Sequence, residues 1–206
     1  MSLRNTSFRL FAIAAGLALG GCLISEAPLL DAKNGRATPL DPGLYEACEF
    51  DGEGGEPECN EIDISRDGAA LYALSAEDED ETTFARFRRI ARGAFLAQLN
   101  EAEDDDDEYF YFIGETAGED FVMAMIVCED IPEAVRAKYS ARGEMEVDED
   151  ASTCVAKSLG AATAAAKAYR AATKPESRSR IVYRKLCGAP CEKVEPGFSQ
   201  KRRDNE

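Results

Sequence analysis

A series of short segments in which apolar and polar residues alternate, between Leu44 and Cys128, constrains the fold of this chain more than any other feature. Residues 61–65 and 69–75 each place apolar side chains at every second position, and Asp67-Gly68 lies between them. Alternation on both sides of an Asp-Gly pair is typical of a β-hairpin. Residues 82–99 alternate around Gly93, which predicts a second hairpin, although Phe84, Phe87 and Ile90 also match helical spacing.

Further strands are expected at residues 44–48, 109–113, 121–128 and 180–186. Two helices are expected late in the chain: residues 133–139, with Asp130 as a capping residue, and residues 159–173, which are rich in Ala and preceded by Ser158. The predicted fold class is therefore α+β, an antiparallel β meander of about seven to eight strands packed by two helices.

Composition excludes several classes of function. The chain has 206 residues, no His and a formal net charge of −16. The absence of His excludes Ser-His-Asp and Cys-His catalysis, and the excess of acids disfavours nucleic acid as a partner. No phosphate-binding, dinucleotide-binding or metalloprotease motif is present, so we expect no enzymatic activity, no cofactor and no metal site.

The N-terminus has the pattern of an export signal. Arg4 and Arg9 precede a run of ten apolar residues, 10–19, which is about half the length needed to cross a bilayer as a helix. The run ends in Leu19-Gly20-Gly21-Cys22, which resembles the lipobox of bacterial lipoproteins. The alternative is an ordinary cleaved signal peptide with Cys22 as a disulfide partner.

The resemblance implies that the chain is cut before Cys22 and that Cys22 carries the lipid. Leu23 follows the cysteine, and in such lipoproteins the absence of Asp there favours the outer membrane. Residues 1–21 are then the signal peptide, 22–42 a flexible lipid-anchored tether, 43–191 one disulfide-stapled globular domain and 192–206 a loose tail.

The other six cysteines are an even number in an exported chain, which is typical of disulfides. Proximity in sequence favours the pairs Cys48–Cys59, Cys128–Cys154 and Cys187–Cys191 among the 15 pairings that six cysteines allow. Cys187 and Cys191 are separated by three residues and not two, so a structural clasp is favoured over a redox pair.

Three clusters of side chains have two interpretations each. The acidic runs 77–81 and 103–108 are solvated turns, or they bind divalent cations weakly and diffusely. The basic cluster of Arg86, Arg88, Arg89 and Arg92 pairs with acids across strands, or it meets an acidic ligand or lipid headgroup. The aromatic residues 109–112 fill the core, or they line a ligand-holding barrel.

The sequence thus predicts a lipid-anchored envelope protein with a structural or protein-interaction role. Its partners would be the membrane, through the lipid on Cys22, and another envelope protein. The alternative is a small-ligand carrier in which the meander closes into a barrel with an apolar pocket.

Overall fold

The computed structural model describes residues 21–50, 55–68, 70–76, 82–101, 108–148 and 153–188. The helices are α2 (Glu133–Ser140), α3 (Leu159–Ala172) and the short 3-10 helix η1 (Pro175–Ser177). The strands are β1 (Leu23–Ser25), β2 (Gly43–Phe50), β3 (Glu58–Asp67), β4 (Leu71–Ala76), β5 (Thr82–Ala91), β6 (Ala94–Glu101), β7 (Tyr109–Ala117), β8 (Asp120–Met125), β9 (Met145–Asp148), β10 (Thr153–Ala156) and β11 (Arg180–Gly188).

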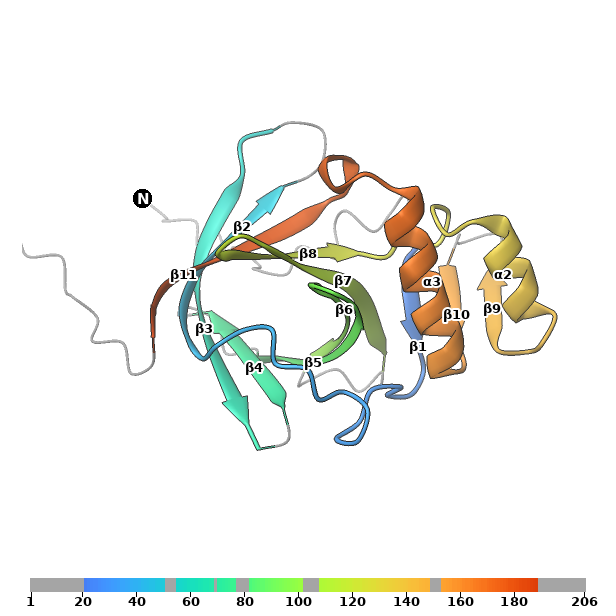
Figure 1. The fold of residues 1–206 in the computed structure, drawn as a ribbon, viewed down its shortest axis with the longest axis horizontal. Helices are drawn as coiled ribbons and strands as arrows, with labels where there is room; N and C mark the ends of the chain where they lie inside the picture. The colour runs from blue at the N-terminus through green and yellow to red at the C-terminus, as the bar shows by residue number, and fades with distance from the viewer. Residues whose placement is uncertain are drawn as a thin grey trace, which may run out of the picture.

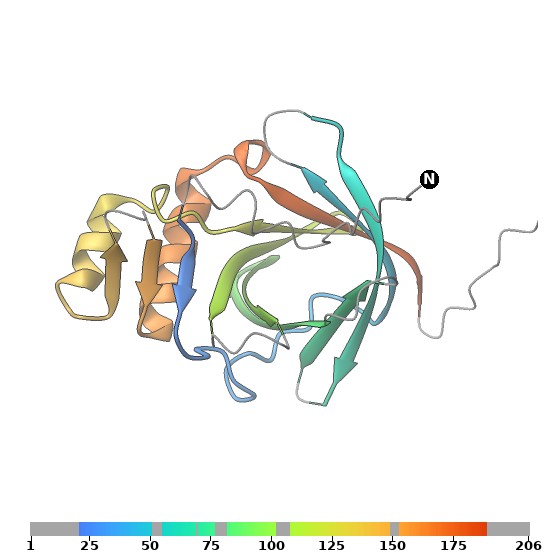
Figure 2. The same ribbon diagram turned by 180° about the vertical axis from the view of Figure 1, so that it is seen from behind.

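Eight antiparallel strands close into a barrel (Figures 1 and 2). Strands β2 to β8 follow one another as a meander, β11 inserts between β8 and β2, and β6 pairs with β7 as well as with β5. The α+β class is confirmed, and the meander takes the more specific form of a closed barrel. Closure leaves no free edge among these eight strands, which is one of the ways a β protein avoids edge-to-edge association.

Both predicted hairpins are confirmed. β3 pairs with β4 across Gly68, whose φ is +38°, and β5 pairs with β6 across Gly93, whose φ is +65°. A Cβ on Gly93 would lie 2.7 Å from the Thr116 hydroxyl oxygen, so this turn requires glycine for space as well as for conformation.

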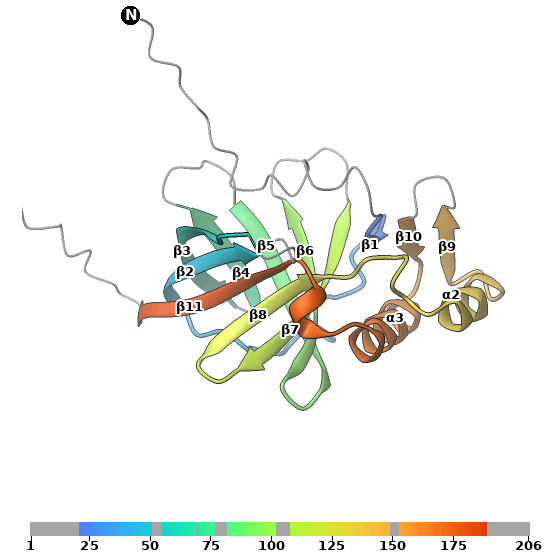
Figure 3. The ribbon, with the colours of Figure 1, turned by 90° about the horizontal axis from the view of Figure 1, so that it is seen from above.

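A small extension is attached to the barrel wall at the first residues of β7. There β1 pairs antiparallel with β7 and parallel with β10, and β10 pairs with β9. Figure 3 shows α2 and α3 together on one side of this extension. The sequence reasoning missed β1, β9 and β10, because strands of three or four residues are too short to show a period.

Helix α3 packs against the extension and the outer barrel wall through small residues. Its buried side chains are Ala161, Ala162, Ala165, Ala166 and Tyr169. They belong to the same core cluster as Tyr111, Ile113 and Leu96 of the barrel wall. Ser158 caps the helix as predicted, because its Oγ accepts a hydrogen bond from the Ala161 N–H at 3.1 Å. The predicted cap of α2 is wrong: the N-cap residue is Pro132, not Asp130, and it makes no side-chain capping bond.

The structure corrects the prediction of a flexible tether at residues 22–42. Leu23, Leu30 and Leu40 in this segment are buried, each at most 3% exposed. The side-chain amide oxygen (Oε1) of Gln98 on β6 accepts hydrogen bonds from the Leu29 and Leu30 N–H groups, both at 2.7 Å. Each part of the segment contacts a different strand, so the sequence shows no period although the segment is packed.

The same segment then closes one end of the barrel (Figures 1 and 3). The Ala37 N–H donates to the Phe87 carbonyl at 2.9 Å. Tyr72 donates its hydroxyl to the Leu40 carbonyl at 2.8 Å, and Tyr45 donates to the Asp41 carbonyl at 2.7 Å. Two tyrosines inside the barrel therefore fix the backbone of the segment that covers them.

Two disulfides join the pairs that proximity in sequence favours. Cys48 and Cys59 are opposite residues on β2 and β3, with their sulfur atoms 2.07 Å apart. Cys128 and Cys154 link the residues after β8 to β10, with their sulfur atoms 1.96 Å apart. Cys191 and residues 192–206 lie outside the described residues, so the Cys187–Cys191 pairing stays a prediction.

Candidate functional site

The closed end of the barrel is filled with aromatic side chains. The rings of Tyr72 and Phe87 lie 5.2 Å apart edge to face, and those of Phe87 and Phe121 lie 5.7 Å apart. Tyr72 and Phe87 are fully buried, and Phe121 is 3% exposed. This half of the interior is therefore a packed core.

The opposite end of the barrel is lined differently. Its inward side chains pack on the same core but are only half-buried: Ala47, Ala76, Phe110, Met125 and Ile181. They come from the second half of β2, the last residues of β4 and β8 and the first residues of β7 and β11, which an antiparallel barrel places toward one end. We call these five residues the barrel mouth.

Two glutamates face each other beside the barrel mouth. Glu49 and Glu58 are opposite residues on β2 and β3, and Glu49 alternates with the inward residues Tyr45 and Ala47. Partial burial, together with the charge of Glu58, raises the pKa of the Glu49 carboxyl. Like charges placed directly opposite each other destabilise a sheet, so this pair has an energetic cost that a cationic group in the mouth would reduce.

The predicted acidic runs are adjacent in sequence to two strands that contribute to the barrel mouth. Residues 77–81 follow β4, and residues 103–108 precede β7. Apart from Glu108, these runs lie outside the described residues. Within the described ranges, no group of three or more Cys, Asp or Glu side chains is arranged to hold a metal ion.

The aromatic residues 109–112 divide between the two cores. Phe112 is 4% exposed inside the barrel, next to the half-buried Phe110 of the mouth. Tyr111 is fully buried on the outer face, beneath α3. Burial raises the pKa of the Tyr111 hydroxyl to about 12, and that hydroxyl lies 2.8 Å from the Ser25 hydroxyl and donates to Gln98 at 3.1 Å. Of the four, only Phe110 contributes to a candidate site.

Two arginines of the predicted basic cluster, Arg88 and Arg89, contact different parts of the protein. Arg88 lies against the N-terminal segment and donates to the Asn34 carbonyl at 3.4 Å. The Arg89 guanidinium lies 5.7 Å from the centre of the Phe95 ring. These arginines therefore contact other parts of the protein rather than a shared opening.

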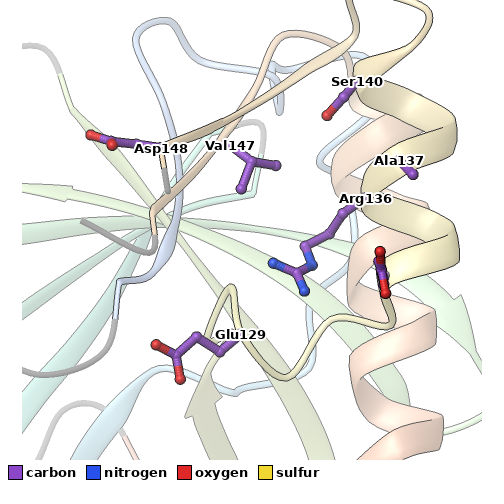
Figure 4. A pocket seen from close by; sticks show the side chains of 7 residues that line it. Glu129, Arg136, Ala137, Ser140, Val147 and Asp148 are labelled. Carbon is purple, nitrogen blue, oxygen red and sulfur yellow. The ribbon is translucent and has the colours of Figure 1, made fainter. Parts of the chain in front are cut away.

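A second candidate site is a hollow of about 400 Å³ between α2 and β9 (Figure 4). Its lining residues are Glu129, Glu133, Arg136, Ala137, Ser140, Val147 and Asp148. Four of them, from Glu133 to Ser140, recur at helical spacing on one face of α2. Arg136 projects from the helix into the hollow, toward the side on which Glu129 and Val147 lie.

Cys22, the predicted lipidation site, is part of the folded domain. It is 7% exposed and forms an isolated β-bridge with Val127. Its carbonyl accepts a hydrogen bond from the Cys154 N–H at 3.1 Å, and burial raises the pKa of its thiol. Of the cysteines in the described ranges, Cys22 is the one with a free thiol. The described part of the chain contains no helix of the length and apolarity needed to cross a membrane.

Sequence reasoning missed most of these residues. Ala47, Ala76 and Glu49 stand out only after the strand register shows which face of each strand is inward. Arg136 carries no signal in the sequence, since one arginine on an exposed helix is ordinary. No family model, curated protein or solved structure matches the chain.

Proposed function

We propose that this chain is a lipid-anchored protein of a bacterial cell envelope whose barrel binds a small apolar or amphipathic molecule at its mouth. One observation carries the proposal: the barrel is filled and covered at one end, whereas the other end presents half-buried apolar side chains. Eight-stranded barrels have an interior that either fills with side chains or holds one small ligand. The asymmetry of this barrel supports the second use at the mouth.

The charge of the mouth supports a narrower choice of ligand. Glu49 and Glu58 are the charged groups that face the apolar ring from β2 and β3. A carboxylate or sulfonate near them would be repelled, whereas an amine would be attracted. The ligand is therefore an apolar molecule whose polar end is neutral or cationic.

A role in binding another envelope protein has less support from the described surface. Leu186, 47% exposed, is the one large hydrophobic side chain that the described residues expose. Protein-binding surfaces commonly present a contiguous apolar patch with aromatic anchors. The five residues of the barrel mouth are apolar but only half-buried.

Blocking the mouth tests the ligand-binding role. Ala76→Phe places a ring among the five mouth residues, and Ala73→Phe places the same ring on the opposite face of β4. We expect neutral N-phenylnaphthylamine to bind the wild type and Ala73→Phe with increased fluorescence, and Ala76→Phe to bind about tenfold or more weakly. The anionic probe anilinonaphthalene sulfonate is expected to bind all three poorly. Equal binding of the neutral probe by both variants, with both folded by circular dichroism, would remove the mouth from consideration.

The lipid anchor has a separate test. A cell labelled with a clickable fatty acid is expected to label the wild type and to leave Cys22→Ala unlabelled, because the thioether and the acylated amine both belong to Cys22. Cys22 contributes to the packed domain, so Leu19→Arg, which alters only the lipobox, serves as a second variant. Label on either variant equal to that on the wild type would contradict the proposed anchor.

A further inference from the structure

We propose that the molecule held at the barrel mouth is an amine with an apolar body, and that the Tyr183 hydroxyl and the Glu49 carboxylate bind its ammonium group. The inference rests on the binding role proposed for the mouth, and it names the chemical class of the ligand. It starts from a hydroxyl group inside the barrel that has no partner in the described part of the protein.

Tyr183 lies on the inner face of β11, next to the mouth. It is two residues from Ile181 and directly opposite Ala47 on β2, and both of these belong to the five mouth residues. Its side chain packs with the core inside the barrel, and the residue is 3% exposed. Tyr183 therefore lies one inward-facing position below the mouth.

The Tyr183 hydroxyl makes no hydrogen bond to any described residue. By contrast, Tyr45 and Tyr72 donate their hydroxyls to backbone carbonyls at the closed end, as buried tyrosines usually do. Within the described ranges, the Arg136 Nε is the one side-chain nitrogen or oxygen that is closed off from solvent and lacks a partner. The Tyr183 hydroxyl is thus not closed off, and a ligand in the mouth can reach it.

Glu49 places a negative charge near this hydroxyl. Burial and, after it, the charge of Glu49 raise the pKa of the Tyr183 hydroxyl, so the hydroxyl is neutral at pH 7 and can accept a hydrogen bond. Glu49 is exposed and lies opposite Ile181 across β2 and β11. The hydroxyl and the carboxylate therefore come from neighbouring strands on one side of the mouth, and Glu58 adds a second negative charge there.

An ammonium group complements this arrangement. It has N–H donors and no acceptor, so it can donate to the hydroxyl and to the carboxylate at once, and its charge strengthens both bonds. It also offsets the repulsion between Glu49 and Glu58. An alcohol could bond to Tyr183 but would leave that repulsion unchanged. The five half-buried side chains of the mouth supply apolar contacts for the rest of the ligand.

Isothermal titration of the full mature protein in detergent tests the ligand class, with a titration into detergent alone as the blank. The probes at pH 7 are 1-octylamine, which is protonated as a lysine side chain is, and 1-octanol, which carries no charge. We expect octylamine to bind at least about tenfold more tightly than octanol. Sodium octanoate is expected to bind more weakly than either, because the two glutamates repel it.

Two variants test the groups that bind the ammonium. Tyr183→Phe removes only the hydroxyl and is expected to weaken octylamine binding about tenfold, while the affinity for N-phenylnaphthylamine stays within about twofold of the wild type. Glu49→Gln is expected to weaken octylamine binding and to leave octanol binding unchanged. Tyr139→Phe removes a hydroxyl from α2, outside the barrel, and is the matched control, which is expected to bind octylamine as the wild type does.

The results separate this inference from the function on which it rests. Equal binding of octylamine and octanol by a wild type that binds N-phenylnaphthylamine would overturn the ligand class and leave the binding role of the mouth in place. Unchanged octylamine affinity in either Tyr183→Phe or Glu49→Gln would overturn the assignment of that residue and with it the proposed ammonium site. A wild type that binds neither octylamine nor N-phenylnaphthylamine would overturn both proposals.

Discussion

Replacing Arg178 by Met is expected to lower the free energy of unfolding by about 3 kcal/mol, because it removes a charged hydrogen bond to Glu115 and leaves two backbone carbonyls without their donor, and each such loss costs about 1–3 kcal/mol. The Arg178 side chain is 3% exposed and donates to the Glu115 Oε2 at 3.0 Å. It also donates to the carbonyls of Arg170 and Thr173, at 3.1 Å and 2.6 Å, near the end of α3. One guanidinium therefore ties the end of α3 to β7 of the barrel.

Arg170→Met is the matched control for this prediction. Arg170 donates to the other oxygen of the same carboxylate, Glu115 Oε1, at 2.6 Å, but its side chain is 40% exposed. Exposed ion pairs contribute about 1 kcal/mol or less. Urea unfolding followed by circular dichroism measures both variants, and equal losses for the two would contradict the role assigned to Arg178.

Removing the Cys128–Cys154 disulfide is expected to have the second large effect. The two cysteines are fully buried and are separated by 26 residues. In the chain-entropy model a bond across that separation stabilises the folded state by about 3–4 kcal/mol. The bond also joins the barrel to β10 of the extension. The variant with both cysteines changed to Ala is therefore expected to melt at a clearly lower temperature.

The Cys48–Cys59 disulfide provides the comparison. It spans 11 residues on a partly exposed face of β2 and β3, so the double Ala variant is expected to lose less stability. Thermal unfolding of both double variants under identical conditions gives the ranking. A larger loss for the Cys48–Cys59 pair would show that the extension contributes little to the stability of the barrel.

Local signals in the sequence account for the parts of the fold that were predicted. The hairpin at Gly68 has an Asp-Gly turn between alternating strands, and α3 has a serine cap before an Ala-rich helix. In both cases the interacting residues are near one another in the chain. The α+β class follows from the succession of such elements.

Closure of the barrel depends on pairing between strands far apart in the chain, which the local pattern of apolar and polar residues does not predict. Tyr183 on β11 pairs with Ala47 on β2, far apart in the chain, and this pairing joins the last strand to the first strand of the barrel. The N-terminal segment was predicted as a tether because Pro and small residues interrupt it, yet Gln98 binds its backbone. A segment that is packed by side chains far away in the sequence shows no hydrophobic periodicity, so its packing cannot be predicted from its own residues.

The candidate sites were the least predictable part of the molecule. The residues of the mouth can be identified only when the inward face of each strand is known. The strand register is what shows that Ala47 and Ala76 point into the barrel. The Glu49–Glu58 pair depends on the same register, because the residues are opposite each other across β2 and β3. The sequence offers two interpretations of the aromatic segment 109–112, and the burial of Tyr111 and Phe112 agrees with core filling.

Packing of residues 22–42 changes what a lipid on Cys22 would do. A flexible tether would hold the barrel at a distance from the headgroups. In this structure the Cys22 carbonyl accepts a hydrogen bond from the Cys154 N–H. Cys22 also lies beside the strands β7 and β8, which supply Phe110 and Met125 to the mouth. A lipidated Cys22 would therefore hold the mouth near the membrane surface, where an apolar ligand is available.

Native mass spectrometry of the protein purified from its own membranes tests ligand binding at the barrel mouth most directly. The wild type is expected to carry, besides its covalent lipid, one non-covalently bound small molecule that is neutral or cationic. Ala73→Phe is expected to retain that molecule, and Ala76→Phe is expected to lack it. A wild type with no bound molecule, or an Ala76→Phe variant that retains it, would contradict the proposed function.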